Sequence, residues 1–331
     1  MPDRVLTDVL IVGAGLSGLM AAHVLNGAGV SVVVVDKGKQ VGGRLATYTV
    51  GAGLADLGAQ FFTARDPEFQ THVDSWIADE LAFIWSRGWS DGSVSDNPRD
   101  GHARYAIRGG LTRLAQHLAQ DLDCRLETPI EKLSFDGERC TAHAIDGILY
   151  EAKQILLTPP VPESLALLAA GNVQLVPAED ELLREIDYQP CLCVVFRIDG
   201  DIYLPEPGAL QRAYADIAWI ADNWRKGISP DARTITVQAS SGYSHEHFED
   251  SDEAIISRFT AELVAFMNPN AHVREVQIKR WRYAQPMKLY PHRFLAATGL
   301  PLVFAGDAFA GPRIEGAALS GLAAARALLA K

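Results

Sequence analysis

Three glycines near the start of the chain have the spacing of a phosphate-binding turn. Residues 13–18 read GAGLSG, after an apolar run at residues 8–12 and before an apolar helical pattern. In such a turn Gly13 permits a sharp bend, Gly15 lets a pyrophosphate approach the backbone, and Gly18 lets the helix pack closely on the strand. The free N–H groups and the positive end of the helix then face the phosphates. The pattern predicts a dinucleotide site.

An acidic residue follows the second strand of this unit. Residues 31–35 form a β-branched run that ends at Asp36, 21 residues after Gly15. A carboxylate at this position accepts hydrogen bonds from the ribose hydroxyls of an adenosine and repels a 2′-phosphate. We therefore expect the bound adenosine to lack a 2′-phosphate.

Three later segments favour a flavin over a nicotinamide cofactor. Gly-Gly-Arg at residues 42–44 offers a second close backbone approach and a cation for the pyrophosphate. Residues 55–62 hold another glycine turn before two phenylalanines. A short apolar strand at residues 302–305 leads to a Gly-Asp pair at 306–307, and residues 315–321 open a last alanine-rich helix. The start of that helix suits the N1–C2=O side of an isoalloxazine, which gains negative charge on reduction. These segments predict FAD.

Together the motifs resemble the FAD-dependent amine oxidase superfamily, and within it the bacterial renalase-like proteins. The resemblance is carried by DLGAQFFTAR at residues 56–65, YAIRGGL at 105–111, WRYAQP at 281–286, and GD, GA and LSG between 306 and 321. It covers nearly the whole chain but is weak over residues 165–275. The ribose acid is Asp36 where the superfamily usually has glutamate. No cysteine lies near the C-terminal motif to form a covalent flavin bond.

The resemblance implies a fold and an activity. The fold would be p-hydroxybenzoate-hydroxylase-like, with FAD bound non-covalently. The activity would be oxidation of the 2- and 6-dihydro isomers of NAD(P)H, with hydride passing to flavin N5 and then to O₂, giving NAD(P)⁺ and hydrogen peroxide. The expected partners are therefore a small-molecule substrate, a dihydronicotinamide dinucleotide or an amine, and O₂.

The predicted cofactor site combines the motifs at both ends of the chain with the glycine turn after residue 55. We assign cofactor binding to Gly13, Ala14, Gly15, Leu16, Ser17, Gly18, Asp36, Lys37, Gly43, Arg44, Gly58, Ala59, Gln60, Phe61, Ile130, Thr158, Gly306, Asp307, Glu315, Gly316, Ala317 and Ser320.

Hydride transfer from a dihydropyridine requires a positioned ring more than a catalytic base. We interpret four residues as catalytic candidates: Gln60, Arg65, His245 and Trp281. Gln60 suits a carboxamide, whereas Arg65 suits a phosphate or carboxylate, or else a surface ion pair with neighbouring acids. His245, in a loop after a predicted strand, either hydrogen-bonds the substrate or has no role. Trp281 packs against the flavin or substrate, or simply in the core. His245 and His247 lack a third ligand, so we expect no metal site.

The order of patterns predicts an α/β protein with a Rossmann-type FAD-binding domain and an inserted α+β substrate domain. Residues 1–72, 100–163 and 276–331 are assigned to the FAD-binding domain, and 73–99 and 164–275 to the substrate domain. The elements expected beyond the first unit are helices at 111–122, 164–168, 178–186 and 252–266, and strands at 124–127, 154–158, 191–198, 210–215 and 234–239.

Composition limits the classes of partner. The formal net charge of −11 disfavours nucleic acid and anionic lipid surfaces. Residues 8–35 are almost uncharged, but their glycines indicate strand, turn, helix and strand rather than a membrane span. The four cysteines form no CxxC pair, which favours structural thiols in a reducing compartment, so we expect a cytoplasmic protein. Oligomeric state stays open.

Two other classes of function use the same scaffold. One is an FAD-dependent amine oxidase or desaturase, which usually flanks the flavin with an aromatic pair. Near the Gly-Asp motif only Phe304 and Phe309 are aromatic, and neither is tyrosine. The other is a non-catalytic protein that uses the scaffold for binding.

Overall fold

The computed structural model describes residues 3–92, 99–137 and 139–330. The chain divides into two compact units, each built from separate stretches of sequence. Unit 1 comprises residues 1–43, 115–188 and 285–331, and unit 2 comprises residues 44–114 and 189–284. The two units are described separately below.

Unit 1 is built on a mainly parallel sheet. Its path runs β16 (Leu295–Ala296), β17 (Leu302–Phe304), β10 (Leu149–Leu157), β1 (Arg4–Val12), β2 (Val32–Val35) and β7 (Asp123–Arg125). The pairs β17–β10, β10–β1, β1–β2 and β2–β7 are all parallel. Two antiparallel strands, β8 (Ile130–Phe135) and β9 (Cys140–Ala144), extend the sheet from β10. The core strands are buried runs of valine, leucine and isoleucine, as expected for a sheet covered on both faces.

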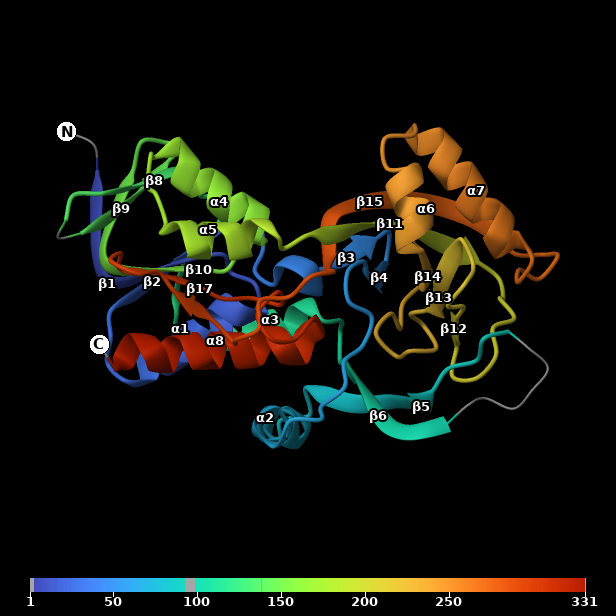
Figure 1. Cartoon of the computed structure of the whole chain (residues 1–331). Helices are drawn as coiled ribbons and strands as arrows, with labels where there is room; N and C mark the ends of the chain where they lie inside the picture. The colour runs from blue at the N-terminus through green and yellow to red at the C-terminus, as the bar shows by residue number, and fades with distance from the viewer. Residues whose placement is uncertain (1–2, 93–98, 138, 331) are drawn as a thin grey trace. The chain divides into compact units, whose positions relative to one another are not determined.

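Helices cover this sheet. The helices α1 (Leu16–Gly27) and α8 (Arg313–Leu329) lie side by side (Figure 1). Gly321 makes their close approach possible, because a Cβ there would stand 2.1 Å from the Ser17 carbonyl oxygen. Elsewhere α4 (Val161–Ala170) packs on β8, and α5 (Pro177–Arg184) follows it. The short α3 (Thr112–Leu118) links the two units along the chain.

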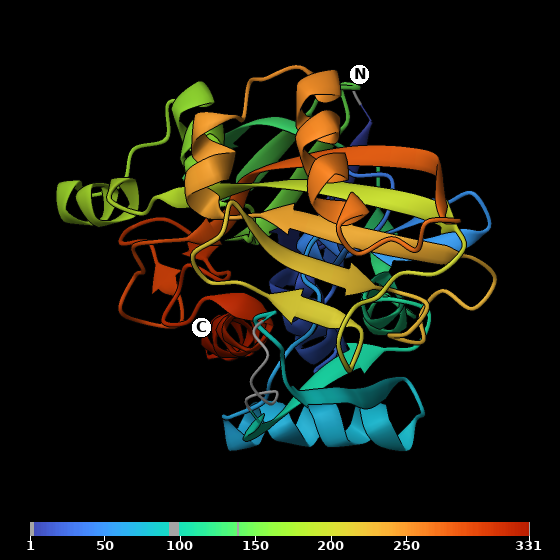
Figure 2. The same ribbon diagram turned by 90° about the vertical axis from the view of Figure 1, so that its right-hand side faces the viewer.

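Unit 2 contains a five-stranded sheet. Its strand order is β12 (Ala209–Gln211), β13 (Ile217–Asp222), β14 (Arg233–Ala239), β11 (Tyr188–Asp199) and β15 (His272–Pro286). The helices α6 (Ser241–Glu246) and α7 (Asp252–Val264) lie over one face of it (Figure 2). Alternation along β11 sorts its side chains: Val194 and Phe196 join the core with α7, and Cys193 faces the opposite side.

The opposite face of this sheet carries a hairpin of β3 (Thr47–Val50) and β4 (Gly53–Asp56), after the short 3₁₀ helix η1 (Gly43–Leu45). A second antiparallel ribbon joins β5 (Ala82–Gly88) to β6 (Arg99–Ile107), and α2 (Pro67–Ala78) precedes it. Asp66 caps α2 by accepting from the N–H of Glu68.

A buried ion pair ties unit 2 together. Lys226, in the turn between β13 and β14, donates to the Asp56 carboxylate at 2.5 Å and to the Gln60 carbonyl oxygen at 2.6 Å. Both side chains of the pair are 0% exposed. Asp56 also accepts from Thr47 Oγ1 and the N–H of Leu111. Burial lowers the pKa of Lys226, and the Asp56 carboxylate acts in the opposite direction.

The predicted fold class is confirmed, and so are the expected elements, apart from shifted ends. The helix expected at 111–122 is shorter, and the strand expected at 210–215 ends at Gln211. The strand β13, the ribbon β5–β6 and the helix α2 were not expected. His245 lies on α6 rather than in a loop, because Ser240 caps a short helix there by accepting from the N–H of Tyr243.

The compact units differ from the predicted domain bounds at four places. Residues 164–188 belong to unit 1, because Gly171 at the end of α4 packs on the Leu133 carbonyl of β8. Residues 44–72, 100–114 and 276–284 belong to unit 2. The hairpin β3–β4 is held there by the N–H of Leu54, which donates to Ser229 Oγ at 2.9 Å. Within the described residues, no helix is long and apolar enough to cross a membrane.

Substitution of Lys226 by methionine should destabilise the protein strongly. It leaves the Asp56 carboxylate buried without its counter-ion, which typically costs about 3–5 kcal/mol. Chemical denaturation measures the change. The matched control is Lys288→Met, because Lys288 pairs with Glu185 at the surface and such pairs contribute about 0–1 kcal/mol. Equal stability of the two variants would refute the importance of the buried pair.

Candidate functional site

The parallel strands of unit 1 bring the predicted cofactor motifs to one edge of the sheet. Val12, Val35, Leu157 and Phe304 end four strands that neighbour one another in register. The glycine turn, Asp36, Thr158 and the Gly-Asp pair follow these ends directly. Ligands of open α/β sheets bind beyond the carboxyl ends of the strands.

Thr158 packs between the two glycine turns. Its Oγ1 donates to the carbonyl oxygens of Val12 and Gly13, at 2.9 and 3.0 Å. A Cβ on Gly13 would stand 2.5 Å from that same hydroxyl, and the Gly13 φ of +106° also requires glycine. On the other side, a Cβ on Gly306 would lie 3.7 Å from the Thr158 carbonyl oxygen. The two turns therefore lie on either side of one residue and can contact one ligand.

Gly15 faces open space, whereas its glycine neighbours are packed. A Cβ on Gly18 would stand 2.1 Å from the Gly13 carbonyl oxygen, whereas a Cβ on Gly15 would meet nothing within 4 Å. The backbone at Gly15 is extended, with φ −74°, so nothing local demands glycine there. Its conformation and surroundings leave the absence of a side chain unexplained unless a ligand approaches.

The first turn of α1 supplies the donors for such a ligand. No side chain caps the helix at Gly15. Ser17 Oγ is buried and has no hydrogen-bond partner among the described residues. Uncapped N–H groups and an unpartnered hydroxyl fit a pyrophosphate. Beside them, Gly42 donates to the Ala14 carbonyl oxygen at 2.8 Å, which brings the Gly-Gly-Arg segment next to the turn.

Asp36 helps to shape the turn. Its two carboxylate oxygens accept from the N–H groups of Ala14 and Gly38, each at 2.7 Å. Each oxygen keeps a further lone pair, so the predicted hydrogen bonds to ribose hydroxyls are compatible with this arrangement. Lys37 instead pairs with Glu163 at 2.8 Å, and the half-buried Ile130 begins β8.

The C-terminal motif adds a second helix start. The N–H of Gly306 donates to Ser320 Oγ at 2.8 Å, and this hydroxyl donates to the Arg293 carbonyl oxygen. Ser320 thus fixes the Gly-Asp turn against α8. No side chain caps α8, and Glu315 lies in its first turn with Gly316 and Ala317. Gly316 is required by packing, because a Cβ there would stand 1.8 Å from the Gly311 carbonyl oxygen.

The remaining predicted cofactor residues lie in the turn that follows β4 in unit 2. Gly58 packs on the Arg44 carbonyl oxygen, where a Cβ would stand 2.0 Å away, and Ala59 donates to the same oxygen. The Arg44 guanidinium donates to the carbonyl oxygens of Tyr283 and Ala284. These contacts hold the turn rigidly and leave its role toward a flavin a prediction.

Gln60 is bound within this turn rather than extended from it. It is 6% exposed. Its Nε2 donates to the carbonyl oxygens of Asp56 and Gly58, and its Oε1 accepts from Trp219 Nε1 at 3.2 Å. Both amide protons are therefore used within the chain, and the expected contact of Gln60 with a carboxamide stays a prediction.

An aromatic cluster surrounds Gln60. It consists of Phe61, Trp85, Trp89 and Trp219 and lies beside the small residues Ala209 and Ala221. The ring centroids of Phe61 and Trp89 are 5.0 Å apart, as are those of Trp89 and Trp219. Trp85 meets Trp89 at 4.6 Å. The tilted and edge-to-face packing of these rings is the arrangement that aromatic pairs prefer.

Two cations of the chain lie against this aromatic cluster. Lys226 Nζ is 4.8 Å from the Trp85 ring centroid, and Arg104 Cζ is 5.6 Å from that of Trp89. Just after β6, Arg108 Cζ lies 5.2 Å from the centroid of the Phe83 ring. Each is in the range of a cation–π contact.

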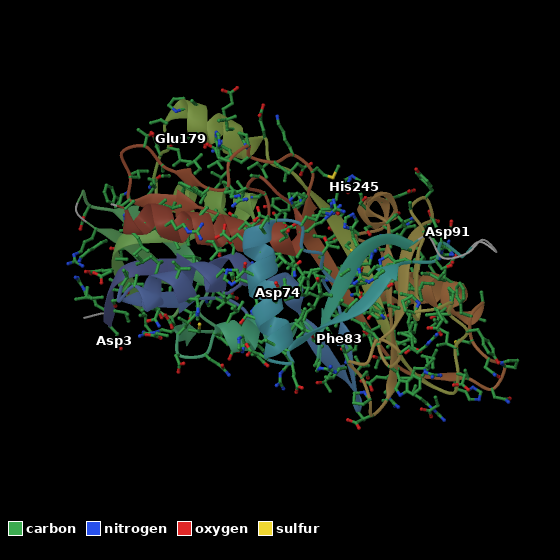
Figure 3. All side chains as sticks on the ribbon, turned by 90° about the horizontal axis from the view of Figure 1, so that it is seen from below. Asp3, Asp74, Phe83, Asp91, Glu179 and His245 are labelled. Atoms are coloured by element: carbon green, nitrogen blue, oxygen red, sulfur yellow. The ribbon has the colours of Figure 1, made fainter. Side chains whose placement is uncertain are left out.

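The structure does not gather the other catalytic candidates into this cluster. Trp281 is half-buried against Val50 and Leu57, and its Nε1 donates to the Leu57 carbonyl oxygen at 2.9 Å. His245 is exposed on α6 (Figure 3), and Arg65 is exposed just before α2. Their proposed contacts with substrate are untested predictions.

Sequence reasoning missed the residues of the aromatic cluster other than Phe61, and it missed both cations. Trp85 and Arg104 lie on the unexpected ribbon, Trp89 directly follows its strand β5, and Trp219 lies on the unexpected β13. The only available signal was the density of tryptophan and arginine in these stretches, which does not reveal a contact between them.

Neither metal nor thiol chemistry is indicated. Within the described residues, no group of three or more His, Cys, Asp and Glu side chains is arranged to hold a metal ion. Burial raises the pKa of the Cys140 thiol to about 12 and that of Cys193 well above its ordinary value. Both thiols are therefore protonated and unreactive near neutral pH.

Residues 11–76 match the NAD(P)-binding Rossmann-like domain. A putrescine oxidase of Kocuria rosea is 40% identical over 67 residues, 20% of this chain and 14% of the relative. An L-amino-acid oxidase of Sistrurus catenatus edwardsii is 54% identical over 50 residues, 15% of this chain and 10% of the relative. The chain thus aligns with only about a tenth of the length of these curated relatives.

The whole chain resembles solved structures in fold. A putrescine oxidase solved with putrescine bound superimposes with a TM-score of 0.73 and 17% identity, over 99% of this chain and 100% of the other. Residues 79–329 match the model of the flavin containing amine oxidoreductases, a family whose cofactor, FAD, fits the cradle in unit 1. The chain therefore belongs to the flavin-containing amine oxidoreductase family.

Proposed function

We propose that the chain is an FAD-dependent oxidoreductase that oxidises isomeric dihydronicotinamide dinucleotides, the 2- and 6-dihydro forms of NAD(P)H. Dioxygen is the second substrate, and the products are NAD(P)⁺ and hydrogen peroxide. One dihydronicotinamide dinucleotide, one O₂ and one proton give one oxidised dinucleotide and one H₂O₂, so the reaction balances. The observation that carries this choice is the aromatic cluster with its own cations.

The aromatic cluster is a poor site for a cationic amine. An ammonium ion binds to the face of an aromatic ring or to a carboxylate. Lys226 and Arg104 already lie against Trp85 and Trp89, and Asp56, the carboxylate behind the cluster, is neutralised by Lys226. A diamine would therefore find these ring faces and this carboxylate already occupied.

The same cluster suits a planar ring attached to an anion. The partly buried indole of Trp85 offers aromatic surface, and the Arg104 guanidinium lies against the neighbouring Trp89. A dihydronicotinamide dinucleotide has a flat ring and a pyrophosphate, so both features match. We therefore assign substrate binding to unit 2 and cofactor binding to unit 1.

FAD supplies the two-electron chemistry when it is bound. The chain's own residues hold it: the N–H groups at the start of α1 and Ser17 would bind the pyrophosphate, and Asp36 the adenosine ribose. The start of α8 would face the flavin ring. No side chain is required as a base, since a dihydronicotinamide becomes aromatic by losing hydride alone.

The first test is spectroscopic. The purified protein should show flavin absorption bands in the visible region. Under anaerobic conditions these should bleach with isomeric dihydro-NAD and stay unchanged with putrescine, and they should return in air together with hydrogen peroxide. Bleaching by putrescine but not by the dinucleotide would establish an amine oxidase instead, and a colourless protein that takes up no FAD would indicate a non-catalytic binding protein.

The second test separates cofactor binding from folding. Gly15→Val should leave the fold intact, because its side chain enters open space, yet it should weaken FAD binding at least about tenfold by blocking the pyrophosphate. Gly27→Ala is the matched control, since Gly27 lies on the same helix and a Cβ there also meets nothing within 4 Å. Titration of each apoprotein with FAD gives the FAD dissociation constants of both variants. Undiminished FAD binding by Gly15→Val would place the cofactor elsewhere.

A further inference from the structure

The indole N–H groups in and near the aromatic cluster differ in whether they have a hydrogen-bond acceptor. Trp85 Nε1 donates to the Pro207 carbonyl oxygen at 3.3 Å, and Trp219 Nε1 donates to Gln60 Oε1 at 3.2 Å. Outside the cluster, Trp281 Nε1 donates to Leu57. Trp89 Nε1 is buried and has no acceptor among the described residues.

The unpaired donor is unusual because Trp89 is only 4% exposed. A buried tryptophan N–H normally finds a hydrogen-bond partner. Leaving such a group unpaired carries the full cost of its desolvation. An acceptor that arrives with a ligand would remove this cost, which makes Trp89 a candidate for binding rather than for packing alone.

The cations near Trp89 indicate which kind of acceptor its N–H could bind. The Arg104 guanidinium lies against its ring at 5.6 Å, and Lys226 lies against the adjoining Trp85. Because these ring faces already contact cations of the chain, a further cationic group has no vacant ring face there, and a neutral or anionic oxygen is the acceptor that suits the N–H. Gln60 is the residue expected to hold a carboxamide, but its two amide protons are donated to carbonyl oxygens of the chain.

We propose that the Nε1–H of Trp89 donates a hydrogen bond to the carboxamide oxygen of the nicotinamide ring. The assignment rests on the proposed function and deepens it, because it names the group that distinguishes a nicotinamide from other flat rings. Trp89 then takes the role that the sequence pattern suggested for Gln60, and the partly buried Phe61 and Trp85 supply apolar surface beside the ring.

The experiment compares two ligands in three proteins. The ligands are NAD⁺ and the analogue in which pyridine replaces nicotinamide, so that only the carboxamide is absent. Titration of the FAD-loaded protein, followed by the change in flavin absorbance, gives both dissociation constants. Wild-type protein should prefer NAD⁺ by about three- to tenfold, the usual worth of one hydrogen bond. Trp89→Phe should reduce this ratio to about one.

Trp85→Phe is the matched control. Its N–H is already paired with Pro207, so the variant should keep the wild-type ratio even if both constants change. Because phenylalanine is smaller than tryptophan, a second version replaces Trp89 with benzothienylalanine, which has the shape of tryptophan but no N–H. That protein should also show a ratio of about one.

The outcomes separate the two proposals. If the wild type binds both dinucleotides and the benzothienylalanine protein keeps the preference for NAD⁺, the assignment of Trp89 is overturned and the proposed function stands. The same holds if a water molecule alone satisfies the N–H, because the ratio is then unchanged by either replacement. If the wild type binds neither dinucleotide, the proposed function fails and the assignment fails with it.

Discussion

The cofactor cradle depends on the parallel register of β1, β10 and β17. Because Val12 pairs with Leu157, and Leu157 with Phe304, the turns that follow these strands are neighbours although they lie almost 300 residues apart in sequence. Thr158 fills the space between the turns with its hydroxyl and carbonyl groups. Gly15, with open space beside it, and the uncapped start of α1 lie at this same edge of the sheet. The helix α8 begins shortly after the Gly-Asp turn at that edge.

In unit 2, hydrogen bonds hold the irregular turn at residues 56–60 in a fixed shape. Backbone carbonyls of residues 56–60 accept hydrogen bonds from Gln60, Lys226 and Gln238. Since Gln60 and Lys226 are buried and the pair of Asp56 and Lys226 is fully enclosed, the turn has little freedom to move. The aromatic cluster is built on this turn through Phe61, so its rings are held in place as well.

The cofactor region was predictable because its signals are local. The strand, glycine turn, helix and acid of residues 8–36 follow one another within a short stretch of sequence, so their order and spacing can be read directly from it. The aromatic cluster was not predictable in this way. Lys226 meets Asp56 across 170 positions, and Trp219 meets Gln60 across 159 positions. Such contacts arise from sheet packing in unit 2, and no spacing in the sequence reveals them. His245 was misplaced because a six-residue helix gives too short a pattern.

A crystal structure of the protein grown with FAD tests the cradle most directly. The account predicts the pyrophosphate within hydrogen-bonding distance, about 3 Å, of the N–H groups in the first turn of α1, with its density passing over Gly15. The same flavin nucleotide should contact the turn at Gly306. A pyrophosphate bound away from Gly15, or a flavin that contacts only one of the two turns, would contradict the account.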